Sequence, residues 1–335
     1  MSKTFIPESY HPVLNLYETQ VAIGCVRNIF QKKLAGNLNL KRVSAPLFVD
    51  PLTGLNDDLN GVERAVTFDI KATGTEAQVV HSLAKWKRMA LYRYKFSEGE
   101  GLYTDMNAIR RDEEMDNLHS IYVDQWDWEK VLPGGRRNLT YLKETVESIV
   151  DAFCDTADEI HTLFPQLKEE FQRDVKFITT QELEDTYPNL TPKEREQKIT
   201  ERYKTVFIMG IGDALKSGQK HDGRAPDYDD WNMNGDILIW SNVLSQAIEI
   251  SSMGIRVDAQ SLAEQLKKAK CEDRSKLLFH KLLLSGELPL TIGGGIGQSR
   301  TCLLLLEKAH IGEVQTSIWD EETLDVCEKS GITLL

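Results

Sequence analysis

The sequence predicts an α+β fold, with a mixed, mainly antiparallel sheet flanked by helices. Segments at residues 17–34 and 138–171 space their apolar residues as helices do, and each carries one apolar stripe suited to packing on a sheet. Strand-like segments at 234–240 and 247–257 follow one another so closely that we expect them to pair antiparallel. One-sided helices together with strands that pair with their sequence neighbours are typical of this fold class.

The composition excludes several classes of protein. The 335 residues are 41% hydrophobic, ample for the core of one large domain or two small ones. A net charge of −12 argues against a nucleic-acid partner. The five cysteines have no paired spacing, so we expect neither a zinc site nor a disulfide framework. No secretory core or membrane-length apolar run is present, so we expect a soluble, cytoplasmic protein.

The first expected strand, at 40–49, contains Pro46. Because proline has no N–H to donate to a ladder, this strand should lie at an edge or an interface. Residues 50–61 are expected to form a solvated loop. A strand at 66–70 and a helix at 79–94 should follow.

Charged residues concentrate in the next part of the chain. Lys85 and Arg88 should share one face of the helix at 79–94, with Lys87 on another, and a solvated basic face is the simplest interpretation. A strand at 99–111 then ends in a loop that contains Arg110 and Glu113, for which an exposed hairpin loop is the simplest interpretation.

The strand expected at 118–129 carries polar residues among apolar ones. Gln125 and Asp127 lie on one face of it, beyond two apolar residues of the same face. This alternation indicates a polar site floored by a sheet. Further expected elements, to which we assign no chemistry, are a strand at 175–178, a helix at 191–203, a strand at 206–212, and helices at 261–268 and 276–284.

A loop at 220–231 contains Arg224 and several carboxylates, together with aromatic residues that are costly to leave on a solvated loop. We therefore expect a lid or a site wall there. Asp236 and Glu249 interrupt the apolar strands that follow. Since a buried carboxylate without a partner is costly, each should meet an arginine or a metal. Magnesium with nucleotide phosphates prefers such oxygen ligands, and ion pairing is the alternative.

A stretch almost without side chains occurs near the C-terminus, between a strand end at 290–292 and a buried helix at 302–306. A flat ring could lie on this backbone, and Arg300 in the first helical turn would favour an anion. This arrangement suits a nucleotide; a simple glycine turn is the alternative. The spacing fits neither the dinucleotide motif nor the P-loop. The glycines are Gly293, Gly294, Gly295 and Gly297.

These glycines and Arg300 match the pattern G-x-G-x-G-x-x-R, which resembles motif 3 of the class II aminoacyl-tRNA synthetase catalytic fold. The helix and proline-bearing strand near the N-terminus resemble motif 1, which builds the dimer interface of that fold. The two strands around the charged loop resemble motif 2. This resemblance implies that Arg110 holds the ATP α-phosphate and Glu113 reads the adenine. It also implies a nucleotide site completed by Gly293, Gly295, Gly297 and Arg300.

Longer blocks resemble the ammonia-dependent asparagine synthetases, the A type of aspartate–ammonia ligase. Asp57 aligns with the aspartate-binding Asp of that family, although the loop around it departs from the family sequence. The blocks run in the family's order, at 81–88, 99–104, 123–129, 224–231, 251–258 and 291–300.

The resemblance implies a two-step reaction. ATP adenylates the β-carboxylate of L-aspartate and releases pyrophosphate; ammonia then attacks the acyl-adenylate to give L-asparagine and AMP. The negatively charged carboxylate and triphosphate repel each other. Arg110 and Arg300, with Mg²⁺ on Asp236 and Glu249, would neutralise these negative charges. Cys25 is interior to a helix and no glutaminase nucleophile is recognisable, so free ammonia is the expected nitrogen source.

The same resemblance implies an aspartate site. Lys87 would pair with a carboxylate of the substrate, and Asp57 and Asp127 would hold its α-ammonium. Arg224 would close over phosphate or carboxylate. The remaining hydrogen bonds would come from neutral groups, on Gln125 and Ser251.

The same residues leave two alternatives to this ligase. An aspartyl-tRNA synthetase would need an anticodon-binding domain, for which a motif 1 beginning near residue 17 leaves no room. We therefore expect residues 1–335 to form a single catalytic domain, acting as a homodimer without nucleic acid or membrane. An aspartate- or adenylate-binding regulatory paralogue of aspartyl-tRNA synthetase is the second alternative. The set Arg110, Asp236, Glu249 and Arg300 argues against it, because a sensor needs no magnesium-bound triphosphate.

Overall fold

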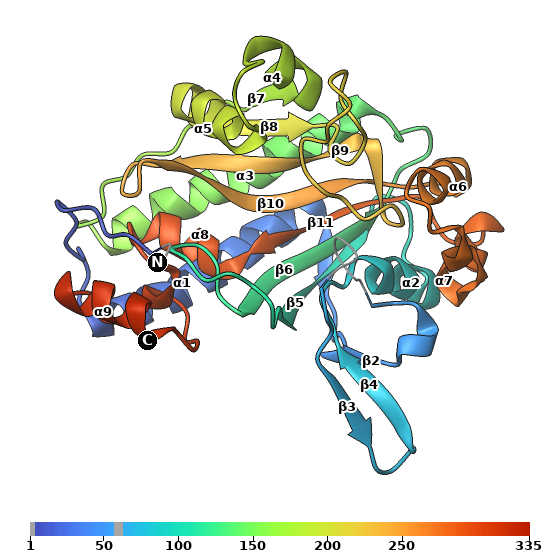
Figure 1. The fold of residues 1–335 in the computed structure, drawn as a ribbon, viewed down its shortest axis with the longest axis horizontal. Coiled ribbons are helices and arrows are strands. Elements are labelled where there is room, and N and C mark those ends of the chain that lie inside the picture. The colour runs from blue at the N-terminus through green and yellow to red at the C-terminus, as the bar shows by residue number, and fades with distance from the viewer. Residues whose placement is uncertain (1–3, 57–62) are drawn as a thin grey trace.

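The computed structural model describes residues 4–56 and 63–335, and its centre is an eight-stranded sheet in the order β1-β5-β6-β11-β10-β9-β8-β7 (Figure 1). The inner pairings are antiparallel, whereas the outermost pairs, β1 with β5 and β7 with β8, are parallel. The predicted mixed, mainly antiparallel sheet is confirmed. The strands are β1 (Leu40–Arg42), β5 (Gly101–Ile109), β6 (Tyr122–Val131), β11 (Thr291–Gly297), β10 (Gln246–Arg256), β9 (Asp229–Ser241), β8 (Thr205–Met209) and β7 (Lys176–Thr179).

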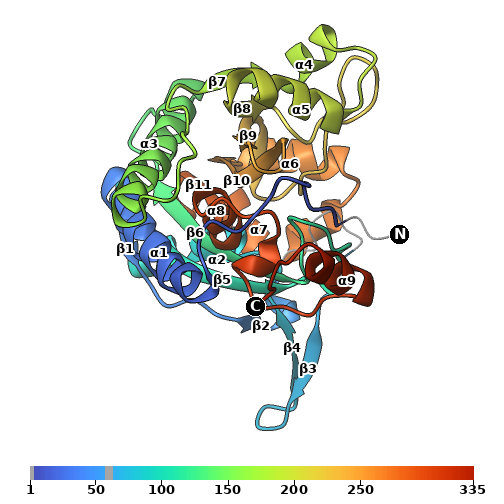
Figure 2. The same cartoon turned by 90° about the vertical axis from the view of Figure 1, so that its left-hand side faces the viewer.

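Two long helices, α1 (Leu16–Leu38) and α3 (Leu139–Leu163), cover one face of this sheet (Figures 1 and 2). Their apolar stripes enter the main core; Phe30 of α1 packs on Trp126 of β6, with ring centroids 4.6 Å apart. Asn15 caps α1 through a capping box, and α3 ends just before Phe164 and its following proline. Both predicted helices are present, with α1 extending four residues beyond its expected end at 34 and α3 ending eight residues before its expected end at 171.

The strand expected at 40–49 is divided. β1 ends at Arg42 and is an edge strand of the main sheet, as its proline-bearing segment predicted. After Pro46 the chain enters β2 (Phe48–Val49), which belongs to a separate three-stranded sheet. Pro46 lies between the two strands because it cannot donate to either ladder. The other strands of the small sheet are β4 (Thr75–Val79) and β3 (Thr67–Ile70), which project from the body as a hairpin (Figures 1 and 2).

Among the predicted boundaries that differ from the structure, two bear directly on the site. The helix expected at 79–94 begins only at Ala84 (α2, Ala84–Tyr94), since Val79 ends β4 and pairs with Phe48. The glycines expected to connect a strand and a helix instead lie within β11, which pairs with β6 and β10 on its two sides. A run of glycines has no side chains whose alternation could indicate a strand, so the sequence did not distinguish a strand from a loop here.

The remaining helices lie around the sheet. α5 (Pro192–Tyr203) begins as predicted, with Thr191 as its N-cap. No helix within residues 4–56 and 63–335 is long and apolar enough to cross a membrane. The other helices are η1 (Pro51–Thr53), α4 (Thr180–Thr186), α6 (Ala259–Lys268), η2 (Glu272–Lys276), α7 (Leu278–Leu284), α8 (Gln298–Leu305), η3 (Ile311–Glu313) and α9 (Glu321–Lys329).

Candidate active site

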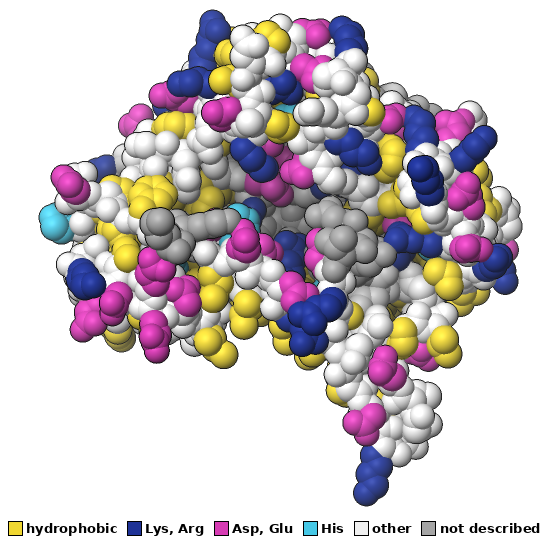
Figure 3. Space-filling view, in the orientation of Figure 1, with side chains coloured by type: hydrophobic (Ala, Val, Ile, Leu, Met, Phe, Trp, Pro, Cys, Tyr) yellow, Lys and Arg dark blue, Asp and Glu magenta, His cyan; other side chains and the backbone are white. Residues whose placement is uncertain are grey.

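A cavity of about 480 Å³ opens on the face of the sheet that α1 and α3 do not cover. Strands β6, β9, β10 and β11 contribute its floor. Its walls come from the loop between β5 and β6, the loop before β9, and the start of α2. Acidic and basic side chains gather in this hollow in the space-filling view (Figure 3). The expected wall at 220–231 is confirmed, because Arg224, Tyr228 and their neighbours line the cavity.

Strand β6 supplies the polar floor through its alternation. Gln125 and Asp127 face the cavity, while Trp126 and Trp128 are buried in the core on the opposite face, as predicted. A Cβ atom on Gly295 of β11 would lie 2.3 Å from Oε1 of Gln125 and 2.8 Å from Oδ1 of Asp127. The absence of a side chain at Gly295 therefore leaves room for these two oxygen atoms above the strand.

Lys87 reaches this floor from α2. Its Nζ atom donates to the carbonyl oxygen of Gly294 at 2.8 Å and lies 2.9 Å from Oδ2 of Asp127. Burial lowers the pKa of Lys87, and the carboxylate of Asp127 opposes that shift. Oδ1 of Asp127 and Oγ of Ser251 are buried and have no hydrogen-bond partner within the described chain. Unpaired buried oxygen atoms are costly, so both are available to a ligand that donates hydrogen bonds.

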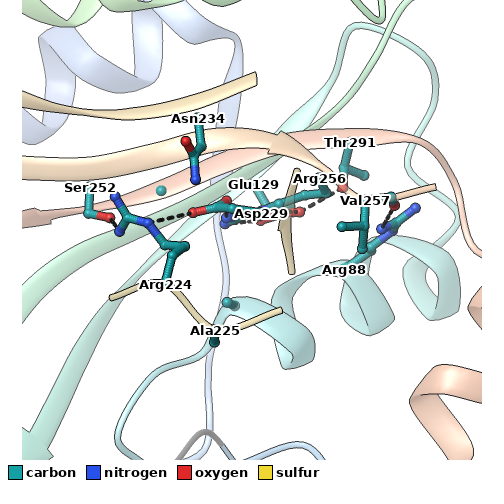
Figure 4. A network of polar contacts seen from close by, with 12 residues as sticks. Arg88, Glu129, Arg224, Ala225, Asp229, Asn234, Ser252, Arg256, Val257 and Thr291 are labelled. Carbon is teal, nitrogen blue, oxygen red and sulfur yellow. Dashed lines mark hydrogen bonds and ion pairs between the residues drawn. The ribbon is translucent and has the colours of Figure 1, made fainter. Parts of the chain in front are cut away.

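A second ion-pair network lies beside the floor (Figure 4). Arg256 donates through Nη2 to Oε2 of Glu129 at 2.8 Å and through Nη1 to Asp229, while Thr291 donates to Oε1 of Glu129 at 2.7 Å. Burial disfavours the charged form of Arg256, but the carboxylates of Glu129 and Asp229 hold the pKa of Arg256 above its usual value. Gly293 lies against this network: a Cβ there would be 2.0 Å from Oε2 of Glu129.

Sequence reasoning missed the members of this network. A signal for Glu129 was present, because it continues the alternation of Gln125 and Asp127 along β6. Arg256 and Asp229 gave no comparable signal. Arg256 pairs with Glu129, 127 positions away in the chain, and with Asp229, 27 positions away, and a local pattern encodes neither contact.

Asp236 of β9 and Glu249 of β10 face the same cavity. Arg224 donates through Nη2 to Oδ1 of Asp236 at 2.5 Å and through Nη1 to the hydroxyl of Ser252. Of the two partners expected for Asp236, an arginine or a metal, the structure shows the arginine. Burial raises the pKa of Asp236 to about 7; Arg224 opposes this shift and the charge of Glu249 adds to it. A register shift between Glu249 and Ser251 breaks the strand alternation, which lets consecutive residues of β10 line the cavity.

These two carboxylates have the chemistry of a cation site. Burial disfavours the charge of Glu249, but Arg300, Lys193 and Arg224 lower its pKa below the usual value. Mg²⁺ prefers hard oxygen ligands and commonly takes one or two carboxylates together with substrate phosphates. Within the described residues no third acidic, histidine or cysteine side chain joins them. Asp236 and Glu249 thus fit a magnesium ion that shares its shell with a ligand.

Arg300 is the third residue of α8 and lines the cavity, as predicted for the first helical turn. Its Nη1 atom donates to the carbonyl oxygen of Glu249 at 2.9 Å, and its Nη2 atom lies 2.8 Å from Nε2 of His119. Arg110 and Glu113 face the cavity from the loop between β5 and β6, with Nη1 of Arg110 3.8 Å from Oε2 of Glu113. Two arginines from distant segments therefore reach one space.

The structure brings nearly all predicted site residues to this cavity. Gly293 does not line it, and Asp57 lies outside the described residues. The predicted residues that do line it are Lys87, Arg110, Glu113, Gln125, Asp127, Arg224, Asp236, Glu249, Ser251, Gly295, Gly297 and Arg300.

Comparison with known families gives a match over most of the chain. A family model described as aspartate–ammonia ligase matches residues 17–331. The aspartate–ammonia ligase of Clostridium perfringens (strain 13 / Type A) is 60% identical over 336 residues, covering 100% of both chains. That of Clostridium tetani is 60% identical over 334 residues, covering 99% of this chain and 98% of the other. That of Lactobacillus acidophilus is 59% identical over 335 residues, covering 99% and 100%.

Solved structures with a similar fold are tRNA synthetases. Asparaginyl-tRNA synthetase from Pyrococcus horikoshii, complexed with asparaginyl-adenylate, aligns with a TM-score of 0.62 at 14% identity, covering 94% of this chain and 74% of that chain. For aspartyl-tRNA synthetase from Entamoeba histolytica the TM-score is 0.61 at 15% identity, with coverages of 91% and 59%. For asparaginyl-tRNA synthetase from the same organism the chain spans 66% of the protein. These likenesses show a class II synthetase catalytic fold.

Proposed function

Because the chain belongs to the aspartate–ammonia ligase family, we propose that its cavity is where ATP drives the amidation of L-aspartate by ammonia. Family membership makes the protein a ligase that forms L-asparagine at the expense of ATP. The proposal extends this activity to its chemical course: a β-aspartyl-adenylate forms first, and AMP and pyrophosphate are the nucleotide products.

The observation that carries the proposal is the arrangement of Lys87, Asp127 and Gly295 at the floor. The cation of Lys87 suits a carboxylate of aspartate, and the unpaired Oδ1 of Asp127 suits its α-ammonium. Gln125 and Ser251 add neutral hydrogen bonds from either side of β11. We expect Asp57 to complete the ammonium site. A molecule bearing both charges close together, as an amino acid does, matches this set.

The nucleotide is assigned to the part of the cavity between Arg110 and Arg300. Arg110 would bind the α-phosphate and Glu113 the adenine, while the ring would lie against the backbone at Gly297, next to Gly295 and the side-chain oxygens of Gln125 and Asp127 above it. A Cβ on Gly297 would lie 3.4 Å from Cβ of Arg300, so this glycine leaves the space beside Arg300 open. We also assign Gly293 of β11 to the nucleotide site, although a Cβ atom placed on it would meet Glu129.

In the first step an oxygen of the β-carboxylate attacks the α-phosphorus, and the bond to pyrophosphate breaks. Arg110 and Arg300 bring positive charge to phosphate oxygens on which negative charge accumulates. Arg224 lies where it could close over phosphate or carboxylate. Asp236 and Glu249 would hold Mg²⁺, which when bound neutralises phosphate charge. In the second step ammonia attacks the acyl carbon, AMP leaves, and the nitrogen loses a proton.

Oligomeric state, domain organisation and location complete the proposal. We propose a homodimer, supported by the edge of β1, which pairs with no further strand among the described residues, and by the exposed apolar side chains of Leu47 and Phe48. We also propose that residues 1–335 act as one catalytic domain without a nucleic-acid partner, consistent with the family match over 17–331. Cytoplasmic location stays a prediction of the sequence.

The experiment that tests the proposal mixes purified protein with aspartate, ATP, Mg²⁺ and ammonium, and follows AMP, ADP and asparagine. Formation of asparagine with equal amounts of AMP and pyrophosphate is expected. ADP as the nucleotide product would contradict the adenylate route. AMP formation that depends on tRNA would point to a synthetase, and binding of aspartate or AMP without turnover would favour the regulatory paralogue.

A further inference from the structure

We propose that His119 is a positioning residue for the reaction: held by Asp116, it accepts a hydrogen bond from Arg300 and fixes the guanidinium at the nucleotide site. The proposal rests on the proposed role of Arg300 in binding ATP. His119 lines the cavity from the loop between β5 and β6, whereas Arg300 belongs to α8. The contact thus joins the two segments that supply the nucleotide-binding arginines.

The two contacts of the imidazole determine its tautomer. Nη2 of Arg300 lies 2.8 Å from Nε2 of His119. A guanidinium nitrogen can only donate, so Nε2 must be the acceptor and carry no proton. Nδ1 lies 2.8 Å from Oδ1 of Asp116, a carboxylate that can only accept. The proton of the neutral ring therefore sits on Nδ1, and a single tautomer satisfies both contacts.

Asp116 is itself held by the turn that it begins. Its Oδ1 atom accepts from the backbone N–H groups of Leu118 at 2.7 Å and His119 at 2.8 Å. The backbone N–H of Asp116 donates to the carbonyl oxygen of His119 at 3.2 Å. Burial opposes its charge, but the contact with His119 and these N–H groups lower the pKa of Asp116 below its usual value. The acceptor that orients the imidazole is thus a fixed carboxylate.

The acceptors of Arg300 differ in kind from those of neighbouring arginines. Arg224 is paired with Asp236, and Arg256 with Glu129, so carboxylates balance both of those cations directly. Arg300 instead donates to an imidazole nitrogen and to the carbonyl oxygen of Glu249. Two neutral acceptors on different elements fix the plane of the guanidinium without a direct salt bridge among the described residues, although the charge of Glu249 also acts on it. The charge of Arg300 is left to act on an anionic ligand, as binding of a triphosphate requires.

A matched set of substitutions tests this role through steady-state kinetics. We expect His119→Ala to raise KM for ATP about tenfold to a hundredfold, as loss of a hydrogen bond to a charged group does, with little change in KM for aspartate. His119→Gln should recover most of this loss because its amide oxygen reaches the position of Nε2. His119→Asn is one methylene shorter and should not. Equal behaviour of the Gln and Asn variants would overturn the proposal.

A double-substitution cycle separates positioning from direct contact with the nucleotide. Calorimetry would give Kd for MgATP with wild type, His119→Ala, Arg300→Ala and the double variant, without aspartate present. If His119 acts through Arg300, the double variant binds no more weakly than Arg300→Ala. If the factors by which the two single substitutions raise Kd multiply in the double variant, His119 contacts ATP itself and the proposal is wrong.

Two controls keep the result independent of folding and of the ligase assignment. His161→Ala changes a histidine in the last turn of α3, outside the cavity lining, and should leave Kd and Tm unchanged. A large fall in Tm of His119→Ala and His119→Gln alike would indicate a purely structural residue and contradict the proposal. If wild type binds MgATP but makes no asparagine, the proposed function fails while the binding cycle still decides the role of His119.

Discussion

Nζ of Lys87 lies 2.9 Å from Oδ2 of Asp127, and the two side chains are only 1% and 4% exposed. Taking both charges out of water is costly, and their attraction offsets that cost only while both partners are present. The pair therefore links stability to the aspartate site, since the same two residues are assigned to opposite charges of the substrate.

We expect Lys87→Met to abolish asparagine formation and to destabilise the fold by about 3 kcal/mol, because Asp127 is left as a buried unpaired charge. Adding Asp127→Asn should recover much of the stability but none of the activity. Urea unfolding and the asparagine assay together measure this. A double variant as unstable as Lys87→Met would show that the ion pair is not the source of the loss.

Substitution of Gly294 and substitution of its neighbour Gly295 should have opposite consequences. A Cβ on Gly294 would lie 2.8 Å from the backbone oxygen of Ser252, so Gly294→Ala forces β10 and β11 apart. We expect a loss of about 1–3 kcal/mol, typical of overpacking. On Gly295 the Cβ would meet side-chain oxygen atoms of Gln125 and Asp127 rather than backbone atoms. Gly295→Ala should therefore stay folded but raise KM for aspartate. Calorimetric unfolding and initial rates distinguish the two, and a poorly folded Gly295→Ala variant would contradict this division.

Removal of divalent cations tests the assignment of Asp236 and Glu249. EDTA should stop turnover and added Mg²⁺ should restore it. Glu249→Gln should lower the rate by about a hundredfold, since it removes one of the anionic oxygen ligands, while AMP binding stays near that of wild type. Glu287→Gln, at an exposed position outside the cavity, serves as the control. Full activity of Glu249→Gln would remove this residue from the cation site.

Glu169 lies away from the active site and makes the stability of the folded protein depend on pH. Burial raises its pKa from 4.5 to about 7, although the N–H of Asn242 donates to its Oε1 atom at 2.8 Å and opposes the shift. The folded protein thus binds this proton more tightly than the unfolded chain does. The contribution of Glu169 to stability is complete below its unfolded pKa and is lost as the pH rises through about 7.

Glu169→Gln keeps an acceptor for Asn242 but cannot ionise. We expect this variant to gain about 2 kcal/mol relative to wild type when the pH rises from 5 to 8. Urea unfolding across this range is the measurement, and exposed Glu170→Gln is the matched control. A difference between variant and wild type that stays constant with pH would exclude Glu169 as the titrating group.

The proposed homodimer predicts that Phe48→Asp yields monomers. A charge on this exposed residue would have to be buried in the interface, at a cost that a moderate interface does not offset. Light scattering should give twice the chain mass of 38.1 kDa for wild type and once that mass for the variant. Leu163→Asp, at an equally exposed position at the end of α3, should remain dimeric; a monomeric wild type would refute the proposal.

Local patterns in the sequence predicted those features that local physics determines. The alternation of Gln125 and Asp127 and the position of Arg300 in the first turn of α8 are confirmed. Lys85 and Arg88 were expected on a solvated face but are buried. Lys85 lies 3.6 Å from Asp227, and Arg88 donates to the carbonyl oxygen of Val257 at 2.7 Å. These partners come from distant segments of the chain, so the spacing of residues within α2 could not predict them.

The glycine-rich strand β11 also bears on how this site could be redesigned. Its two neighbours, β6 and β10, pair with it along its length, and atoms placed on Gly293, Gly294 or Gly295 would overlap what surrounds them. A side chain added to β11 would therefore displace its neighbours rather than create new contacts to a ligand. An engineer who wants this scaffold to accept another amino acid must alter the flanking positions, Gln125 and Ser251, and leave the strand between them untouched.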